Sequence, residues 1–222
     1  MIMLQKRGDN LKNFPVFTTS SGIASLTLEE VPYSQTAYIR IQSASDPVEL
    51  LQECKSFCLA VGAAQVYATG HDSLEKYPVY TDLIKMTASK ECIPNSDVCL
   101  FPVLEKTLDQ WRQIYNDKMK AVPLHAYMTE TKARKILQQG NAYFAHVNGE
   151  ILGIGTVSGS FVDAVATVKR GAGAAVMQAL CQLTDSDQVC VEVATENLPA
   201  MALYQRLGFI PVEQIARWYK IN

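Results

Sequence analysis

The chain has 222 residues, of which 48% are hydrophobic and 19% are charged, and its formal net charge is −2. This length suits one large domain or two small ones, and the composition favours a packed globular core. The weak net charge disfavours nucleic-acid binding. No apolar run reaches membrane-spanning length and no apolar signal core opens the chain, so we expect a cytoplasmic protein without a membrane partner.

In the first half, alternating and apolar patterns predict strands over 23–31 and 36–43. A helix is predicted over 46–62, with Asp46 as its N-cap, Pro47 at the first helical position and Gly62 at its end. Shorter elements follow: a strand, a helical turn and a strand, over 63–70, 72–77 and 79–87. The predicted order of this half is therefore β-β-α-β-α-β.

A polar segment with Pro94 and Asn95 marks a plausible boundary, so we predict an N-terminal region of 1–95 and a second domain of 96–222. In the second domain the order is predicted to be β-α-α-β-β-β-α-β-α-β. Asn148-Gly149 indicates a tight hairpin. The remaining elements are expected over 98–104, 105–119, 129–139, 142–147, 150–158, 161–168, 174–183, 188–194, 198–207 and 209–221.

The first half is similar to a shortened copy of the end of the second half, since both contain successive β-α-β units. The copy lacks a glycine turn, because its helix opens with the residues SASDP. Two interpretations stay open: a duplication in which the first copy lost this turn, or the general likeness of any two β-α-β units.

The stretch VKRGAGAAVMQAL, residues 168–180, joins a predicted strand to a predicted helix. Gly171 and Gly173 allow close approach of a ligand to the backbone, and Lys169 and Arg170 add positive charge. Successive N–H groups at a helix start can bind a diphosphate. The alternative interpretation is a flexible turn of small residues.

Spacing separates the nucleotide-binding motifs that use such turns. The P-loop pattern GxxxxGK[ST] is absent. The dinucleotide pattern requires a small third residue where this chain has Val176, although Glu192 lies near the position of a ribose-binding acid. A dinucleotide-binding oxidoreductase therefore remains an alternative.

The sequence RGAGAA resembles the pyrophosphate motif R/Q-x-x-G-x-G/A of the GNAT superfamily of N-acetyltransferases. Downstream, ENLPAMALYQRLGF resembles the second motif of that superfamily, N-x-x-A-x-x-x-Y-x-x-x-G-F, with matches at Asn197, Ala200, Tyr204, Gly208 and Phe209. The resemblance covers about 125 C-terminal residues. It implies an α/β (α+β) fold, in which a mixed, mostly antiparallel sheet is flanked by helices beside a smaller N-terminal half.

The resemblance also implies that acetyl-CoA is the cosubstrate, bound where strands 161–168 and 188–194 splay apart at a bulge in the first of them. Backbone groups of Val165 and Thr167 are expected to pair with the pantetheine arm. The other expected cofactor contacts are Arg170, Gly171, Ala172, Gly173, Ala174, Ala175, Asn197 and Tyr204.

The implied activity is acetyl transfer to a primary amine by direct attack on the thioester. Tyr204 occupies the position of the family's general acid, and we expect it at the edge of a buried stripe formed by Leu203 and Leu207. The general base stays open between Glu192, Asp163 and an ordered water. The alternative for Tyr204 is a half-buried packing residue.

The loop between the first two helices of the second domain is expected to line the acceptor site, through Tyr115, Val122, Pro123 and Tyr127. A small amine, an amino acid, a peptide N-terminus or a lysine side chain would all suit it. A non-catalytic acyl-CoA-binding protein is a further alternative. The first half is expected to cover the cleft, mediate a homodimer or brace the sheet.

None of the six cysteines forms a Cys-x-x-Cys pair. Cys54 and Cys58 lie one helical turn apart, as metal ligands can, but His71 is the only histidine near them in sequence. We therefore expect buried thiols and no metal site.

Overall fold

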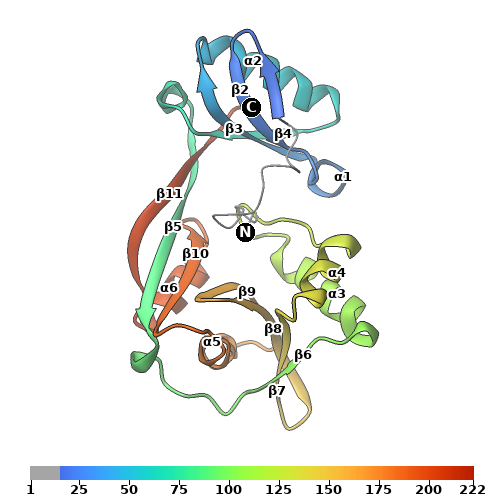
Figure 1. Cartoon of the computed structure of the whole chain (residues 1–222), viewed down its shortest axis with the longest axis vertical. Helices are drawn as coiled ribbons and strands as arrows, with labels where there is room; N and C mark the ends of the chain where they lie inside the picture. Colours follow the sequence, from blue (N-terminus) through green and yellow to red (C-terminus); the bar gives the residue numbers. More distant parts are fainter. Residues whose placement is uncertain (1–15) are drawn as a thin grey trace. The chain divides into compact units, whose positions relative to one another are not determined.

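The computed structural model describes residues 16–222, which form two compact units. Among the described residues, unit 1 contains 84–213, whereas unit 2 contains 16–83 and 214–222 (Figure 1). The division differs from the predicted boundary after residue 95 because Met86 and Ile93 pack into the core of unit 1. The polar segment that suggested a boundary is instead a surface connection within this unit.

Strands β5 (Val79–Ser89) and β11 (Ile210–Lys220) each contribute residues to both units. Within unit 2, Arg217 Nε donates to Asp82 Oδ1 at 2.7 Å, which ties the last part of β11 to the first part of β5. Two long strands, and not a linker in one place, therefore connect the units covalently.

Unit 2 orders its strands β1-β2-β3-β4-β11. Its elements are β1 (Val16–Thr19), β2 (Gly22–Thr27), α1 (Val31–Ser34), β3 (Thr36–Ala44), α2 (Pro47–Ala60), β4 (Gln65–Thr69) and a 3₁₀ turn η2 (Asp72–Lys76). Strand β1 was not predicted, because its four residues are exposed or half-buried and carry no apolar period. The strand predicted over 23–31 ends at Thr27, and the short helix α1 begins at Val31 with Pro32 in its first turn.

Helix α2 begins and ends as predicted. The Oδ1 atom of Asp46 accepts hydrogen bonds from the N–H groups of Val48 at 3.1 Å and Glu49 at 3.0 Å. Pro47 is the first helical residue, and Gly62 follows the helix with φ of +98°. The buried face of α2 consists of Leu50, Leu51, Cys54 and Cys58.

This cap supports a first prediction. Asp46→Ala should lower the free energy of unfolding by about 1 kcal/mol, because two N–H groups at the start of α2 lose their acceptor. Urea denaturation of the full chain measures the change. An unaltered midpoint would contradict a stabilising role for the cap.

Unit 1 orders its strands β11-β5-β10-β9-β8-β7-β6. The pairs β6–β7, β7–β8 and β8–β9 are antiparallel, whereas β9 runs parallel to β10. The elements are η3 (Lys90–Cys92), β6 (Cys99–Pro102), η4 (Glu105–Thr107), α3 (Leu108–Met119), α4 (Glu130–Gln138), β7 (Ala142–Val147), β8 (Glu150–Ser158), β9 (Phe161–Thr167), α5 (Gly173–Gln182), β10 (Gln188–Ala194) and α6 (Leu198–Arg206). The predicted order and the mixed, mostly antiparallel sheet are confirmed.

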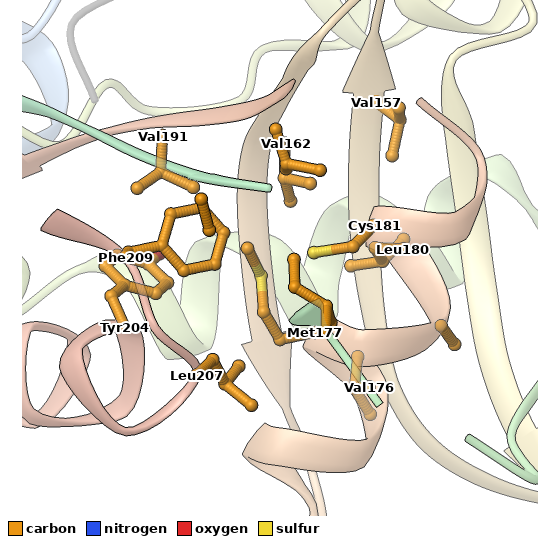
Figure 2. Close-up of a cluster of buried hydrophobic side chains, with 14 of the residues drawn as sticks. Val157, Val162, Val176, Met177, Leu180, Cys181, Val191, Tyr204, Leu207 and Phe209 are labelled. Carbon is orange, nitrogen blue, oxygen red and sulfur yellow. The ribbon is translucent and has the colours of Figure 1, made fainter. Parts of the chain in front are cut away.

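Helices α5 and α6 cover one face of the sheet of unit 1. Met177 and Leu180 of α5 pack with Leu207, which follows α6, and with Val191 of β10 (Figure 2). Helices α3 and α4 cover the other face, where Trp111 of α3 is fully buried. Because strand residues alternate between faces, neighbours in β9 and β10 point toward different helix pairs.

Candidate active site

Strands β9 and β10 form a parallel pair at one position only, Phe161 with Cys190. On its other edge β9 pairs with β8, but Val157 pairs with Val162 while Thr156 pairs with Ala164. Asp163 is therefore the extra residue of a β-bulge, as predicted for this strand. Beyond the bulge, the edge of β9 that faces β10 has no strand partner within the described part of the chain.

The glycine turn follows β9 directly. The Val168 N–H donates to the Leu152 carbonyl oxygen at 2.9 Å, which ends the pairing with β8. Gly171 has φ of +86°, a backbone conformation that favours glycine. At Gly173 an added Cβ would lie 3.5 Å from Leu203 Cδ2, so packing within the protein does not require a glycine there.

Helix α5 begins at this turn without a side-chain cap. Its N-cap residue is Ala172, and the first hydrogen bond of the helix runs from the Val176 N–H to the Ala172 carbonyl oxygen at 3.0 Å. The N–H groups of Gly173, Ala174 and Ala175 precede this bond and have no acceptor within the helix. They point out of the helix start, where the macrodipole attracts an anion.

The second motif forms α6 and its ends. Asn197 is the N-cap, and its Oδ1 accepts from the Ala200 N–H at 3.4 Å. Gly208 follows the helix with φ of +85°, and the ring of Phe209 lies 5.7 Å from that of Tyr204. The roles expected for Asn197 as a cap and for Gly208 as the left-handed residue after the helix are confirmed.

Tyr204 is 7% exposed and lies among Met177, Leu207 and Phe209 (Figure 2). The expected edge position is wrong, because Tyr204 and Leu207 form the buried face while Leu203 is half-buried. Burial, with a contribution from the Cys181 thiol, raises the pKa of Tyr204 far above its usual value. The phenol therefore keeps its proton at physiological pH.

Glu192 of β10 and Asp163 of β9 interact on the sheet. Glu192 is half-buried, between Val191 and Val193, which point toward α5 and α6, so its side chain lies on the opposite face. Burial raises the pKa of Glu192, and the nearby charge of Asp163 raises it further. Ser158 Oγ of β8 donates to Asp163 Oδ2.

Lys85 of β5 completes this polar group. Its charge lowers the pKa of Glu192, against the effect of burial, and its Nζ atom lies 5.4 Å from the centroid of the Phe161 ring. Neither Lys85 nor Ser158 was predicted as a site residue. The alternation of side chains along β5 and β8 indicates the face of the sheet on which each residue lies. Only the order of the strands in the sheet brings Lys85 and Ser158 beside Asp163 and Glu192.

The connection between α3 and α4 contains the residues expected to line the acceptor site. Tyr115 is buried in the core between the helices and the sheet, whereas Val122, Pro123 and Tyr127 are half-buried. The side chain of Asn116 holds this connection by hydrogen bonds in both directions with the backbone of Met128, at 2.8 and 3.1 Å. Sequence patterns gave no signal for this clamp.

His125 was not predicted as a site residue. Its ring lies 5.5 Å from that of Tyr115, and burial lowers the pKa of His125 to about 3, with a smaller effect from Lys132. The imidazole is therefore neutral at physiological pH and adds no charge to the connection between α3 and α4.

Over residues 16–222 the structure contains no group of three or more His, Cys, Asp or Glu residues arranged to hold a metal ion. Burial raises the pKa of Cys54 to about 12 and that of Cys58 to about 11. Both thiols thus keep their protons at neutral pH. Within the same residues, no helix combines the length and the apolar character needed to cross a bilayer.

No protein-family model matches the chain, and no curated protein matches it in sequence. Solved structures do match it. A conserved protein of unknown function from Staphylococcus epidermidis ATCC 12228 aligns with a TM-score of 0.59 and 12% identity, over 99% of this chain and 98% of that one. A GCN5-related N-acetyltransferase from Sphaerobacter thermophilus aligns with a TM-score of 0.58 and 11% identity, over 90% of this chain and 75% of that one.

A tandem GNAT protein from the clavulanic acid biosynthesis pathway aligns with a TM-score of 0.50 and 12% identity, over 90% of this chain and 78% of that one. The chain therefore has the fold of the GCN5-related N-acetyltransferases.

Proposed function

We propose that this protein is an N-acetyltransferase that transfers an acetyl group from acetyl-CoA to a primary amine. The observation that carries the proposal is the parting of β9 from β10 beside the uncapped start of α5. One edge of a strand and the N–H groups of a helix start are thus both available to a single extended ligand. The shared fold supports the same activity class.

Acetyl-CoA fits these unpaired groups. Its diphosphate would accept hydrogen bonds from the N–H groups of Gly173 to Ala175, with Arg170 as the nearby cation. Its pantetheine amides would pair with the backbone of β9 at Val165 and Thr167, as a partial extra strand does. We also assign Asn197 to the cofactor arm, beside its role as a helix cap.

The proposed chemistry uses two side chains of unit 1. The amine nitrogen attacks the thioester carbonyl carbon, so a C–N bond forms and the C–S bond breaks. Glu192 accepts the proton that the amine loses, because burial and Asp163 bring the pKa of Glu192 closer to neutrality. Tyr204 donates its proton to the departing thiolate, whose thiol has a pKa of about 8.5.

Gly173→Asp tests the diphosphate contacts. The new carboxylate should repel the diphosphate and weaken acetyl-CoA binding at least tenfold more than Gly173→Ala does. Because an acid is favourable at a helix start, the free energy of unfolding should stay unchanged or rise by about 0.3–1 kcal/mol. Calorimetric titration with acetyl-CoA measures the affinity. Equal affinities for the Ala and Asp variants would place the diphosphate elsewhere.

Ligand-dependent melting separates acetyl transfer from the dinucleotide alternative. A ligand at 100 times its Kd adds about 2.7 kcal/mol to the stability of a folded protein. Acetyl-CoA and CoA should therefore raise Tm by about 5 °C or more. A rise with NAD(P) but none with CoA would overturn the proposal.

Thiol release separates an enzyme from a non-catalytic acyl-CoA-binding protein. Incubation with acetyl-CoA and a panel of small amines, amino acids and peptides should release CoA faster than incubation without protein. Binding of acetyl-CoA without acceleration by any amine would favour the non-catalytic alternative.

A further inference from the structure

The side chain of Lys85 in β5 lies on the same face of the unit 1 sheet as that of Glu192 in β10. Ile84 and Met86, the neighbours of Lys85 in β5, pack into the core that contains the buried residues of α5 and α6. Because strand residues alternate, the Lys85 side chain leaves the sheet on the opposite face, as the Glu192 side chain does. Both residues are half-buried, so water screens the interaction between their charges only in part.

The course of the Lys85 side chain brings its ammonium group over β10. In the sheet, β10 lies between β5 and β9. The Nζ atom of Lys85 nevertheless lies 5.4 Å from the centroid of the Phe161 ring of β9, and Phe161 pairs with Cys190 of β10. Neighbouring strands are about 4.8 Å apart, so Lys85 and Phe161 can meet only over β10. They meet two residues before Glu192, on the face that carries its carboxylate.

Neighbouring side chains hold the charged groups around Glu192 in place. An ammonium group within about 6 Å of a ring centroid is attracted to the face of that ring, as Lys85 is to Phe161. Ser158 of β8 pairs with Phe161, and its Oγ atom donates to Asp163 Oδ2. Two groups of opposite charge, the Lys85 ammonium and the Asp163 carboxylate, are thus each fixed by a neighbour in the sheet.

The charges that act on Glu192, among the described residues, come from three strands: Asp163 of β9, Lys85 of β5 and Glu213 of β11. Burial raises the pKa of Glu192, and so do the carboxylates of Asp163 and Glu213, whereas Lys85 lowers it. A protonated carboxyl group cannot accept the proton of an amine. Without Lys85, the ionised form of Glu192 would therefore be present only at higher pH.

We propose that Lys85 is a positioning residue that keeps Glu192 ionised and able to accept the proton of the attacking amine. This inference rests on the proposed function, in which Glu192 is the general base. The proton passes from the amine nitrogen to a carboxylate oxygen of Glu192, and none passes to Lys85. The ammonium group acts only through Glu192, by favouring its charged form.

The kinetic test compares the pH dependence of kcat/KM in variants of the full chain. In the unaltered chain, kcat/KM falls as the pH is lowered through the pKa of Glu192. Lys85→Met keeps an aliphatic side chain beside Phe161 but loses the charge, and it should move this decrease to higher pH by about one unit. Within the decrease, such a displacement lowers kcat/KM at a given pH by about tenfold, and the loss should shrink as the pH rises. Lys85→Arg restores the charge and should restore the profile.

Lys106→Met is the matched control, because it removes the same charge elsewhere in unit 1. Lys106 is exposed in η4, which follows β6, and β6 lies at the other end of the strand order of unit 1 from β5 and β11. The profile of this variant should equal that of the unaltered chain. An equal displacement in Lys106→Met and Lys85→Met would overturn the specific role of Lys85.

A direct titration of Glu192 tests the inference without relying on activity. In protein with ¹³C-labelled glutamate, the carboxyl signal that Glu192→Gln removes belongs to Glu192. The midpoint of its titration should lie about one pH unit higher in Lys85→Met than in the unaltered chain. A midpoint that does not move overturns the role of Lys85. If the midpoint moves but no amine accelerates thiol release, the effect of Lys85 on Glu192 is confirmed and the proposed acetyl transfer is overturned.

Discussion

Replacing Glu192 with glutamine should lower kcat by about a hundredfold or more, because the variant cannot accept the proton of the attacking amine. The same change should leave Tm unchanged or raise it. The pKa of Glu192 is raised in the folded protein, so its ionised form opposes folding at pH values above that pKa. Steady-state thiol release and thermal melting measure the two effects. A lower kcat together with an unchanged or higher Tm would show that the variant loses catalysis and not stability.

The pH dependence of the rate gives an independent test of this base. In the unaltered protein, kcat/KM should fall as the pH is lowered through the raised pKa of Glu192, since the protonated acid accepts no proton. Glu192→Gln should remove this decrease. Glu91→Gln, which alters an exposed carboxylate of the same unit, is the matched control and should change nothing. If only Asp163→Asn removes the decrease, Asp163 is the base.

Replacing Tyr204 with phenylalanine should lower kcat at least tenfold while acetyl-CoA affinity stays nearly unchanged. The ring and its packing against Phe209 are kept, and only the hydroxyl that would protonate the thiolate is removed. Kinetics with saturating acetyl-CoA and a binding titration provide the two measurements.

Tyr143→Phe is the control for this variant, because Tyr143 is half-buried and packs against the same core of unit 1. Its kcat should equal that of the unaltered chain. An unchanged kcat for Tyr204→Phe would show that Tyr204 is a packing residue, in agreement with its low exposure.

Local signals in the sequence predicted the local structure well. The caps at Asp46 and Asn197 and the glycine after α6 depend on neighbouring residues alone, and each is found as expected. The depth of Tyr204 was not predicted correctly. Helical periodicity indicates the direction in which a side chain points. The extent to which Tyr204 is buried depends on residues of α5 and on Phe209, which pack against it.

Features that depend on pairing between distant strands were missed. Arg40 and Trp218 come from opposite ends of the chain and meet only because β11 pairs with β4. The division into units was likewise hidden, since β5 and β11 are long strands whose two parts pack into different cores. No pattern within a single strand marks the residue at which it passes from one core to the next.

The segments β3-α2-β4 and β9-α5-β10 differ in the source of the negative charge at the start of the helix. In β3-α2-β4 the strands pair at five successive positions, from Thr36 with Gln65 to Arg40 with Thr69, and the carboxylate of Asp46 occupies the first N–H groups of the helix. Because this carboxylate belongs to the chain itself, its contact with the helix start does not depend on the concentration of any ligand. In β9-α5-β10 no side chain caps the start of α5. An anion that binds to its first N–H groups must therefore come from a ligand, and the fraction of molecules with a bound anion would depend on the ligand concentration. The proposed function therefore predicts that each molecule binds one acyl donor, at the start of α5 and not at the start of α2.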